Sequence, residues 1–77
     1  MKLTILSPEK TLLCEEVSYV ELPGTIGRFV VLKGHAPVIS SLGSGVVRYE
    51  VGGERKEIPV RGGFAEVRAD NIKVCAD

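Results

Sequence analysis

The chain has 77 residues, and its ten basic and ten acidic side chains give a net charge of zero. A chain of this length forms one small domain, and the lack of a basic excess argues against nucleic acid as the main ligand. Apolar residues make up 44% of the sequence, and eleven Val and five Ile outnumber seven Leu and four Ala. Because branching at Cβ favours strands, the composition predicts an all-β domain and disfavours a helical bundle.

The sequence shows no sign of a membrane span or a signal peptide. No uninterrupted apolar stretch reaches ten residues, whereas a spanning helix needs about 20. The apolar residues at the N-terminus are interrupted by Ser7-Pro8, which is too early for a signal peptide. We therefore expect a cytosolic protein.

Short apolar runs separated by turn residues predict strands along the chain. In the first half these runs are residues 1–5, 11–14, 19–22, 29–32 and 38–42. The first and third runs alternate apolar with polar residues, which predicts strands with one buried face. The run Phe29–Leu32 is apolar throughout, which predicts a strand buried on both faces.

The second half predicts two hairpins, each with two runs around a two-residue loop. They are residues 46–51 and 54–60 around Gly52-Gly53, and residues 64–69 and 72–76 around Asp70-Asn71. Glycine supplies the positive φ of a primed hairpin turn, and Asp and Asn both tolerate the left-handed region. The chain, residues 1–77, is therefore predicted to be one all-β domain, a flattened β-sandwich or barrel of roughly ten short strands.

No group of residues indicates catalysis or metal binding. His35 is the only histidine, and nothing in the sequence places it beside a nucleophile and an orienting third group. The two cysteines form no C-x-x-C motif, and with one histidine they do not supply a four-ligand zinc site. Gly62-Gly63 lacks the rest of a phosphate-binding loop, and no predicted helix follows it. We therefore expect no catalytic residue, no metal and no cofactor.

The same residues have structural interpretations. We expect His35 to be a turn residue bonded to local backbone, and Gly62-Gly63 to be a tight strand connection that requires glycine. Cys14 and Cys75 are expected to be reduced, mostly buried thiols in strands. A neutral domain offers no basic groove in which bases could stack on aromatic rings, so the four aromatic residues are expected in the core. They are Tyr19, Phe29, Tyr49 and Phe64.

Six sequence motifs occur in order over the whole chain. They are Ser7-Pro8-Glu9, Leu22-Pro23-Gly24 with Gly27, Gly34-His35-Ala36-Pro37, Gly45-Val46-Val47-Arg48, Gly62-Gly63-Phe64-Ala65-Glu66-Val67 and Asn71-Ile72-Lys73-Val74-Cys75-Ala76-Asp77. The motif Gly34-His35-Ala36-Pro37 is the most specific of them. Together the motifs resemble the N-terminal β-domain of the epsilon subunit of F-type ATP synthases, a family whose fold is a flattened β-sandwich.

This resemblance implies a structural role rather than catalysis. In the family, the domain packs beside the gamma subunit and rests on the polar loops of the membrane-embedded c-ring. Proton-driven rotation then reaches the catalytic alpha and beta subunits through the stalk. We therefore expect a non-catalytic rotor subunit at the cytoplasmic face of the bacterial inner membrane, which meets the membrane only through the c-ring. Its expected partners are gamma and the c-ring, without nucleic acid.

The resemblance also assigns residues to two surfaces. The residues of the loop that faces the c-ring are Thr25, Ile26, Gly27 and Arg28, and the residues on the side that faces gamma are His35, Ser40 and Arg61. Arg28 stands where the family often has an acidic residue, and Lys33 where it usually has a proline. We expect the charge of Arg28 to contribute to the ring contact by the ~0–1 kcal/mol of an exposed ion pair.

Most members of the family that this chain resembles continue into a helical hairpin that can inhibit ATP hydrolysis. This chain stops at Asp77, so we expect a subunit that couples rotation without braking it and without binding ATP. Two other classes of β-domain stay open. A lipoyl-type carrier requires a lysine at a hairpin tip, where this chain has Gly52-Gly53 and Asp70-Asn71. A nucleic-acid-binding barrel requires a basic surface.

Overall fold

The computed structural model describes residues 1–77 and contains nine strands and no helix. The strands are β1 (Lys2–Leu6), β2 (Thr11–Glu16), β3 (Tyr19–Pro23), β4 (Arg28–Val31), β5 (Val38–Leu42), β6 (Gly45–Val51), β7 (Glu54–Val60), β8 (Gly63–Arg68) and β9 (Asn71–Ala76). The prediction of an all-β chain of roughly ten short strands is confirmed. No helix is present that could cross a membrane.

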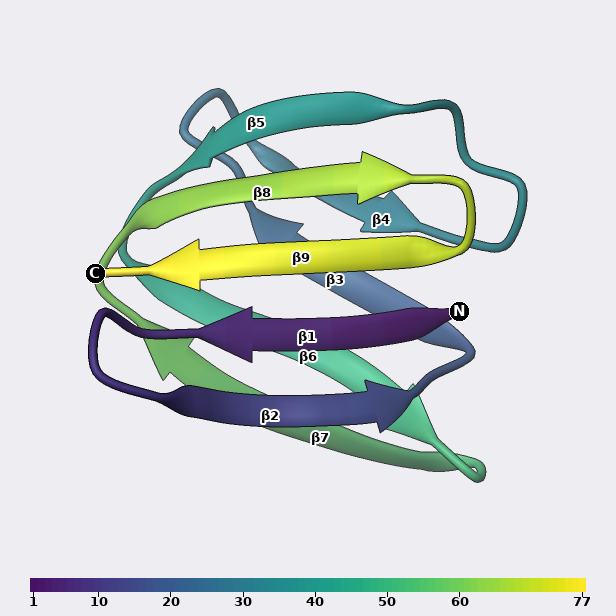
Figure 1. Cartoon of the computed structure of the whole chain (residues 1–77). Helices are drawn as coiled ribbons and strands as arrows, with labels where there is room; N and C mark the ends of the chain where they lie inside the picture. Colours follow the sequence, from purple (N-terminus) through teal and green to yellow (C-terminus); the bar gives the residue numbers. More distant parts are fainter.

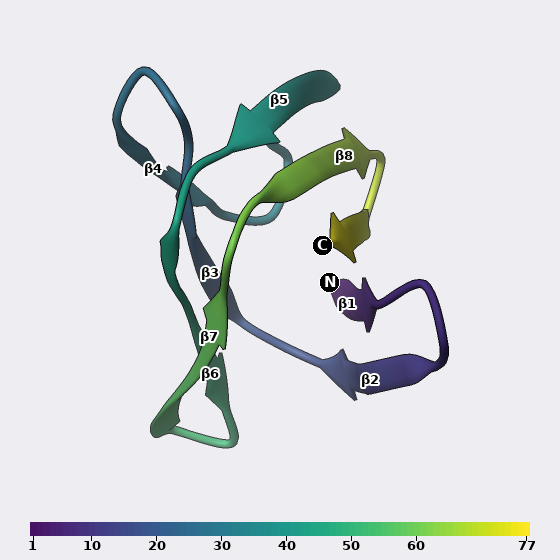
Figure 2. The same ribbon diagram turned by 90° about the vertical axis from the view of Figure 1, so that its left-hand side faces the viewer.

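The strands form two sheets that pack face to face (Figures 1 and 2). The five-stranded sheet has the order β2-β1-β9-β8-β5, and the four-stranded sheet has the order β4-β3-β6-β7. The first and last strands, β1 and β9, are parallel neighbours at the centre of the five-stranded sheet, and every other pair is antiparallel. The pairing of β1 with β9 therefore joins the two ends of the chain within the five-stranded sheet.

The core lies between the two sheets and is a single cluster of 15 buried apolar residues. Alternating strand positions supply it, for example Leu3 and Ile5 from β1 and Val20 and Leu22 from β3, all of which are fully buried. Burying a side chain of this size stabilises the fold by about 1.5–3 kcal/mol relative to leaving it in water. No buried side chain is charged, so the core is built of apolar side chains and one tyrosine, Tyr49.

Both predicted hairpins are present, and one differs in its turn. Gly52 and Gly53 have φ of 57° and 83°, as a primed turn between β6 and β7 requires. In the second hairpin Asn71 belongs to β9 and pairs with Arg68, so the turn is formed by Ala69 and Asp70. The sequence placed this turn one residue too late, because Ala69 takes the left-handed φ of 51° that is uncommon for alanine.

The prediction that the run Phe29–Leu32 is buried on both faces is wrong. The strand β4 ends at Val31 and lies at the edge of the four-stranded sheet, where it pairs only with β3. Val31 points into the core, whereas Val30 is 40% exposed and Leu32 52% exposed. The run is apolar throughout, but the sandwich has only one interior, so one face of β4 meets solvent.

Candidate interaction surfaces

The loop between β3 and β4, residues 24–27, is fastened to both sheets. The backbone N–H of Thr25 donates to the carbonyl oxygen of Ser41 at 3.0 Å, and the two hydroxyl oxygens are 2.7 Å apart. The N–H of Gly27 donates to the carbonyl oxygen of Gly24 at 3.1 Å, which closes the loop on itself. Gly24 also forms a bridge with Leu42 at the end of β5. The loop is therefore a fixed turn at one end of the sandwich.

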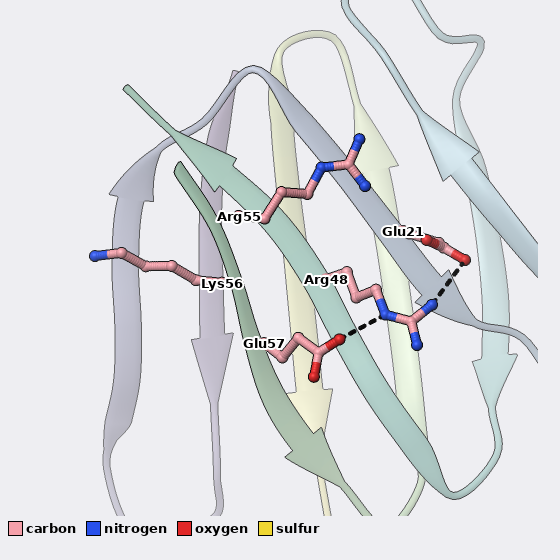
Figure 3. A pocket seen from close by; sticks show the side chains of 5 residues that line it. All are labelled: Glu21, Arg48, Arg55, Lys56 and Glu57. Atoms are coloured by element: carbon pink, nitrogen blue, oxygen red, sulfur yellow. Dashed lines mark hydrogen bonds and ion pairs between the residues drawn. The ribbon is translucent and has the colours of Figure 1, made fainter. Parts of the chain in front are cut away.

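Arg28, the residue after this loop, is bound within the chain. Its Nε donates to Oε2 of Glu21 at 2.7 Å, and its terminal NH2 group donates to the carbonyl oxygen of Val46 at 2.8 Å. Glu21 also meets Arg48 at 3.6 Å, and Arg48 meets Glu57 at 2.7 Å (Figure 3). The four charged side chains form a row across β4, β3, β6 and β7 on the outer face of the four-stranded sheet.

The pairing changes the proton affinity of two members of the row. The hydrogen bond from Arg28 is the main cause that lowers the pKa of Glu21 below its usual value. The hydrogen bond to Glu57 is the main cause that raises the pKa of Arg48. The charge of Arg28 is therefore balanced by Glu21 within the chain.

A second set of polar contacts lies beside this row on the same face. The guanidinium carbon of Arg55 lies 4.3 Å from the ring centroid of Tyr19, and its Nε lies 3.3 Å from the carboxylate of Glu50. Arg55 and Lys56 line an open depression together with Glu21, Arg48 and Glu57, although Lys56 points away from the others (Figure 3). The outer face of the four-stranded sheet thus has most of its charges paired with one another.

The structure spreads His35, Ser40 and Arg61 along the molecule rather than gathering them. His35 lies in the connection from β4 to β5, at the end of the sandwich opposite to the loop of residues 24–27 (Figure 1). Ser40 is half-buried within β5 and donates to the neighbouring carbonyl oxygen of Ser41 at 3.0 Å. Arg61 is exposed between β7 and β8, at the same end as that loop. The strand β5 runs between the two ends.

The outer face of the five-stranded sheet carries apolar side chains that sequence reasoning missed. Phe64 was expected in the core, but it is 52% exposed, because its neighbour Ala65 takes the inward position of β8. Phe64 pairs with Cys75, and Cys75 pairs with Leu6, so these side chains form a row across β8, β9 and β1. Ile39, which is 72% exposed on β5, is the diagonal neighbour of Phe64.

We name Leu6, Ile39, Phe64 and Cys75 the outer apolar row. The signal for it was present in the sequence: in the run Phe64-Ala65-Glu66-Val67 only one alternating set faces the core. Phe64 and Glu66 share the other face, so an inward Val67 requires an outward phenylalanine.

The remaining candidates for chemistry have structural roles. His35 Nδ1 lies 2.7 Å from the carbonyl oxygen of the adjacent Ala36, as expected for a turn histidine. Gly63 has φ of 123°, and a Cβ there would overlap the carbonyl oxygen of Cys75, so the tight connection that requires glycine is confirmed.

Both cysteines are free thiols, but Cys14 is exposed and Cys75 half-exposed, so the expectation of mostly buried thiols is wrong. No cluster of three or more potential metal ligands occurs.

Comparison with known proteins identifies the family. The family described as "ATP synthase, Delta/Epsilon chain, beta-sandwich domain" matches residues 1–77. The ATP synthase epsilon chain of Solibacter usitatus is 43% identical over 77 residues, which are 100% of this chain and 58% of that one. The epsilon chain of Magnetococcus marinus is 48% identical over 75 residues, 97% of this chain and 55% of that one. The chain thus spans little more than half the length of these relatives.

Solved structures show the same fold in ATP synthase assemblies. A chain of the Euglena gracilis mitochondrial ATP synthase, from an OSCP/F1/c-ring assembly, matches with a TM-score of 0.89 at 26% identity, over 96% of this chain and 48% of that one. A chain of the Tetrahymena thermophila mitochondrial ATP synthase, from a central stalk and c-ring structure, matches with a TM-score of 0.80 at 16% identity, which supports the fold alone. The match over the whole sequence, the epsilon-chain relatives and the shared sandwich together show that this chain belongs to the ATP synthase delta/epsilon family.

Proposed function

We propose that the chain is a non-catalytic subunit of the central stalk of an F-type ATP synthase, where it links the gamma subunit to the c-ring. In this position it couples proton flow to ATP synthesis. The observation that carries the proposal is the similarity to ATP synthase epsilon chains, which runs over the entire sequence. The proposed location is the cytoplasmic face of the bacterial inner membrane, with attachment through the c-ring only.

Two surfaces of different character support a linking role. The outer apolar row exposes Ile39 and Phe64 on one sheet, and exposed apolar patches of this kind mark sites of protein contact. It includes Ile39 on β5, the strand that runs between His35 and Arg61. We propose that gamma packs along β5 and this row, so that one long contact includes His35, Ser40 and Arg61. The loop of residues 24–27 then lies at one end of that contact and is proposed to face the ring.

We also propose that the fold is stiff enough to transmit torque. The first and last strands pair at the centre of one sheet, and the loop of residues 24–27, which joins two strands of the other sheet, bonds to β5. A load applied at one end of the sandwich is therefore carried by strands that run the full length of the molecule. No residue in this arrangement is proposed to act in catalysis, and no cofactor is proposed.

Affinity purification tests the proposal. A tagged chain is expressed in the organism that carries it, its membranes are solubilised in a mild detergent, and the captured proteins are identified. Gamma, the catalytic alpha and beta subunits and the c-ring are expected to co-purify. A Phe64→Asp, Ile39→Asp double variant, which changes only exposed positions, is expected to lose them while it remains folded. Capture of neither gamma nor the ring by the unchanged chain would refute the proposal.

The alternative functions make different predictions in the same experiment. A lipoyl-type carrier would show an added mass on a lysine, but the hairpin tips carry Gly52-Gly53 and Ala69-Asp70. A nucleic-acid-binding domain would release oligonucleotides when salt is raised. The net charge of zero argues against such a ligand, because binding to phosphates requires a basic excess.

A further inference from the structure

The hydroxyl groups of Thr25 and Ser41 join the loop of residues 24–27 to the end of β5. Their oxygens are 2.7 Å apart, and the backbone N–H of Thr25 donates to the carbonyl oxygen of Ser41 at 3.0 Å. The loop connects two strands of the four-stranded sheet, whereas β5 is an edge strand of the five-stranded sheet. These bonds therefore cross from one sheet to the other, at the place where Figure 1 shows the end of β5 beside the loop.

The carbonyl oxygen of Ser41 also binds Ser40. The hydroxyl of Ser40 donates to it at 3.0 Å, and a carbonyl oxygen has two lone pairs, so it can accept this bond together with the bond from Thr25. We name Thr25, Ser40 and Ser41 the hydroxyl network. One acceptor in this network thus serves a residue of the loop and a residue of the side that the resemblance assigns to gamma.

Ser41 lies beside the outer apolar row as well. It is exposed on β5 and is directly opposite Phe64 on β8. Directly opposite residues of an antiparallel pair have Cβ atoms ~4.5–5.5 Å apart, so a partner that packs on Phe64 also covers Ser41. What packs on the row therefore acts on the residue to which the loop is bonded.

We propose that Thr25 and Ser41 are positioning residues, through which a subunit bound on the outer apolar row holds the loop of residues 24–27 in place. The inference rests on the proposed function, which supplies gamma as the partner on the row. When gamma covers the row, the end of β5 no longer moves with the loop, so the loop opens only by breaking its bonds to Ser41. Because such coupling is reciprocal, a contact that holds the loop strengthens gamma binding by the same factor.

Two backbone contacts hold the base of the loop independently of the hydroxyl network. The N–H of Gly43 donates to the carbonyl oxygen of Pro23 at 2.8 Å, and Gly24 forms a bridge with Leu42. Variants that delete a hydroxyl of the network are therefore expected to fold and to keep the base of the loop closed.

Hydrogen exchange of peptides that contain residues 24–27, followed by mass spectrometry, tests the proposal. It is measured on the free chain and on the chain bound in the soluble part of the ATP synthase, which contains gamma and lacks the c-ring. Exchange in the loop is expected to be slower in the bound chain. Thr25→Val keeps the shape of the side chain and deletes its hydroxyl, and it is expected to reduce this slowing about 2- to 10-fold, the effect of losing one hydrogen bond.

Three further variants separate the hydroxyl network from other causes. Thr25→Ser keeps the hydroxyl and is expected to behave as the unchanged chain does. A double variant, Thr25→Val with Ser41→Ala, is expected to match either single variant, because both substitutions remove the same contact. Ser44→Ala deletes an exposed hydroxyl from the neighbouring turn between β5 and β6, and it is expected to leave the slowing unchanged.

The outcomes distinguish this link from the proposed function. The link is overturned if gamma binds and exchange in the loop is not slower. It is also overturned if Thr25→Val speeds exchange by the same factor with and without gamma, since the hydroxyls then act only locally. If the unchanged chain does not bind the soluble part of the ATP synthase, the proposed function is refuted together with the link.

Discussion

The guanidinium of Arg28 and the carboxylate of Glu21 meet across the β3–β4 pair, with Nε and Oε2 2.7 Å apart. The two residues are not directly opposite in register, because Arg28 pairs with Pro23 and Glu21 with Val30. Arg28 therefore reaches along the strand to the carboxylate, and its Nη2 donates to the carbonyl oxygen of Val46 on β6. One side chain thus links the first residue of β4 to the adjacent strand β3 and to β6 beyond it.

This contact predicts a pH dependence of stability. The pKa of Glu21 is lower in the folded chain than its ordinary value of 4.5. The stabilisation is therefore present above the unfolded-state pKa and is lost as the pH falls through the lower folded-state pKa. The midpoint of thermal unfolding, measured from about pH 7 to about pH 3, is expected to be higher for the unchanged chain than for Glu21→Gln, and the difference is expected to shrink below about pH 4.5.

Glu54→Gln is the control, because no ion pair involves Glu54. Its unfolding midpoint is expected to follow that of the unchanged chain closely. Curves for Glu21→Gln and the unchanged chain that stay parallel at every pH would show that the Arg28 contact does not stabilise the fold.

Local patterns were sufficient to predict much of the fold. Val47 and Tyr49 are buried and Arg48 is not, as alternation requires, and Gly52-Gly53 forms the predicted turn. Such signals depend on residues close in sequence. The parallel pairing of β1 with β9 joins the two ends of the chain, and no local signal encodes it. The lack of a local signal for strand order also explains why the burial of Phe29–Leu32 on both faces was wrongly predicted. An apolar composition does not reveal that a strand lies at the edge of a sheet.

The candidate site was less predictable, because its geometry depends on register between strands. The sequence predicted a loop of residues 25–28, whereas Arg28 is the first residue of β4, and the partner of Arg28 was not predicted. Glu21, Arg48 and Glu57 come from three strands, and their alignment follows from pairings that the sequence does not state. The exposure of Phe64 could have been derived from the alternation of β8, whereas the exposure of Ile26 depends on the turn that Thr25 makes with Ser41.

A pair of leucine variants tests the assignment of the core. Leu22 is fully buried and Leu32 is 52% exposed. Leu22→Ala is expected to destabilise the chain by about 2–5 kcal/mol, because the surrounding side chains cannot fill the space left. That is a large part of the roughly 4–12 kcal/mol expected for a chain of this length. Leu32→Ala is expected to change the free energy of unfolding by less than about 0.5 kcal/mol, and urea titration measures both. Equal losses of unfolding free energy in the two variants would show that Leu22 and Leu32 do not differ in burial as described.

A pair of glycine variants tests the backbone. At Gly63 the φ of 123° is unfavourable for other residues, and a Cβ would overlap the backbone of Cys75 on the neighbouring strand. Gly63→Ala is expected to cost more than the about 1–3 kcal/mol of backbone strain alone, since β8 and β9 must also move apart.

Gly52→Asn is the control for Gly63→Ala. Gly52 has φ of 57°, no atom lies within 4 Å of the position that a Cβ would occupy, and asparagine tolerates this conformation. The change in the free energy of unfolding is expected to stay within about 0.5 kcal/mol. Denaturant unfolding gives both values, and a Gly63→Ala variant as stable as the Gly52→Asn variant would contradict the close approach of β8 to β9.

Labelling of the two thiols, Cys14 and Cys75, tests where the proposed gamma contact lies. Cys75 lies in the outer apolar row between Phe64 and Leu6, and Cys14 lies on β2, the strand at the opposite edge of the same sheet from β5. In the isolated chain both thiols are expected to react with a maleimide, and Cys14, the more exposed of the two, is expected to react faster. Reactivity of a thiol requires access of the reagent, so a subunit that covers the row will protect Cys75.

In the assembled complex, Cys75 is therefore expected to be protected far more strongly than Cys14. The measurement uses Cys14→Ser and Cys75→Ser variants, each with one thiol, and follows labelling by intact mass. A Phe64→Asp substitution in the Cys14→Ser background is expected to restore labelling of Cys75, because it disrupts the row that gamma is proposed to cover. If Cys14 is protected and Cys75 stays reactive, gamma packs against the β2 edge rather than along β5, and the proposed contact through His35, Ser40 and Arg61 is wrong.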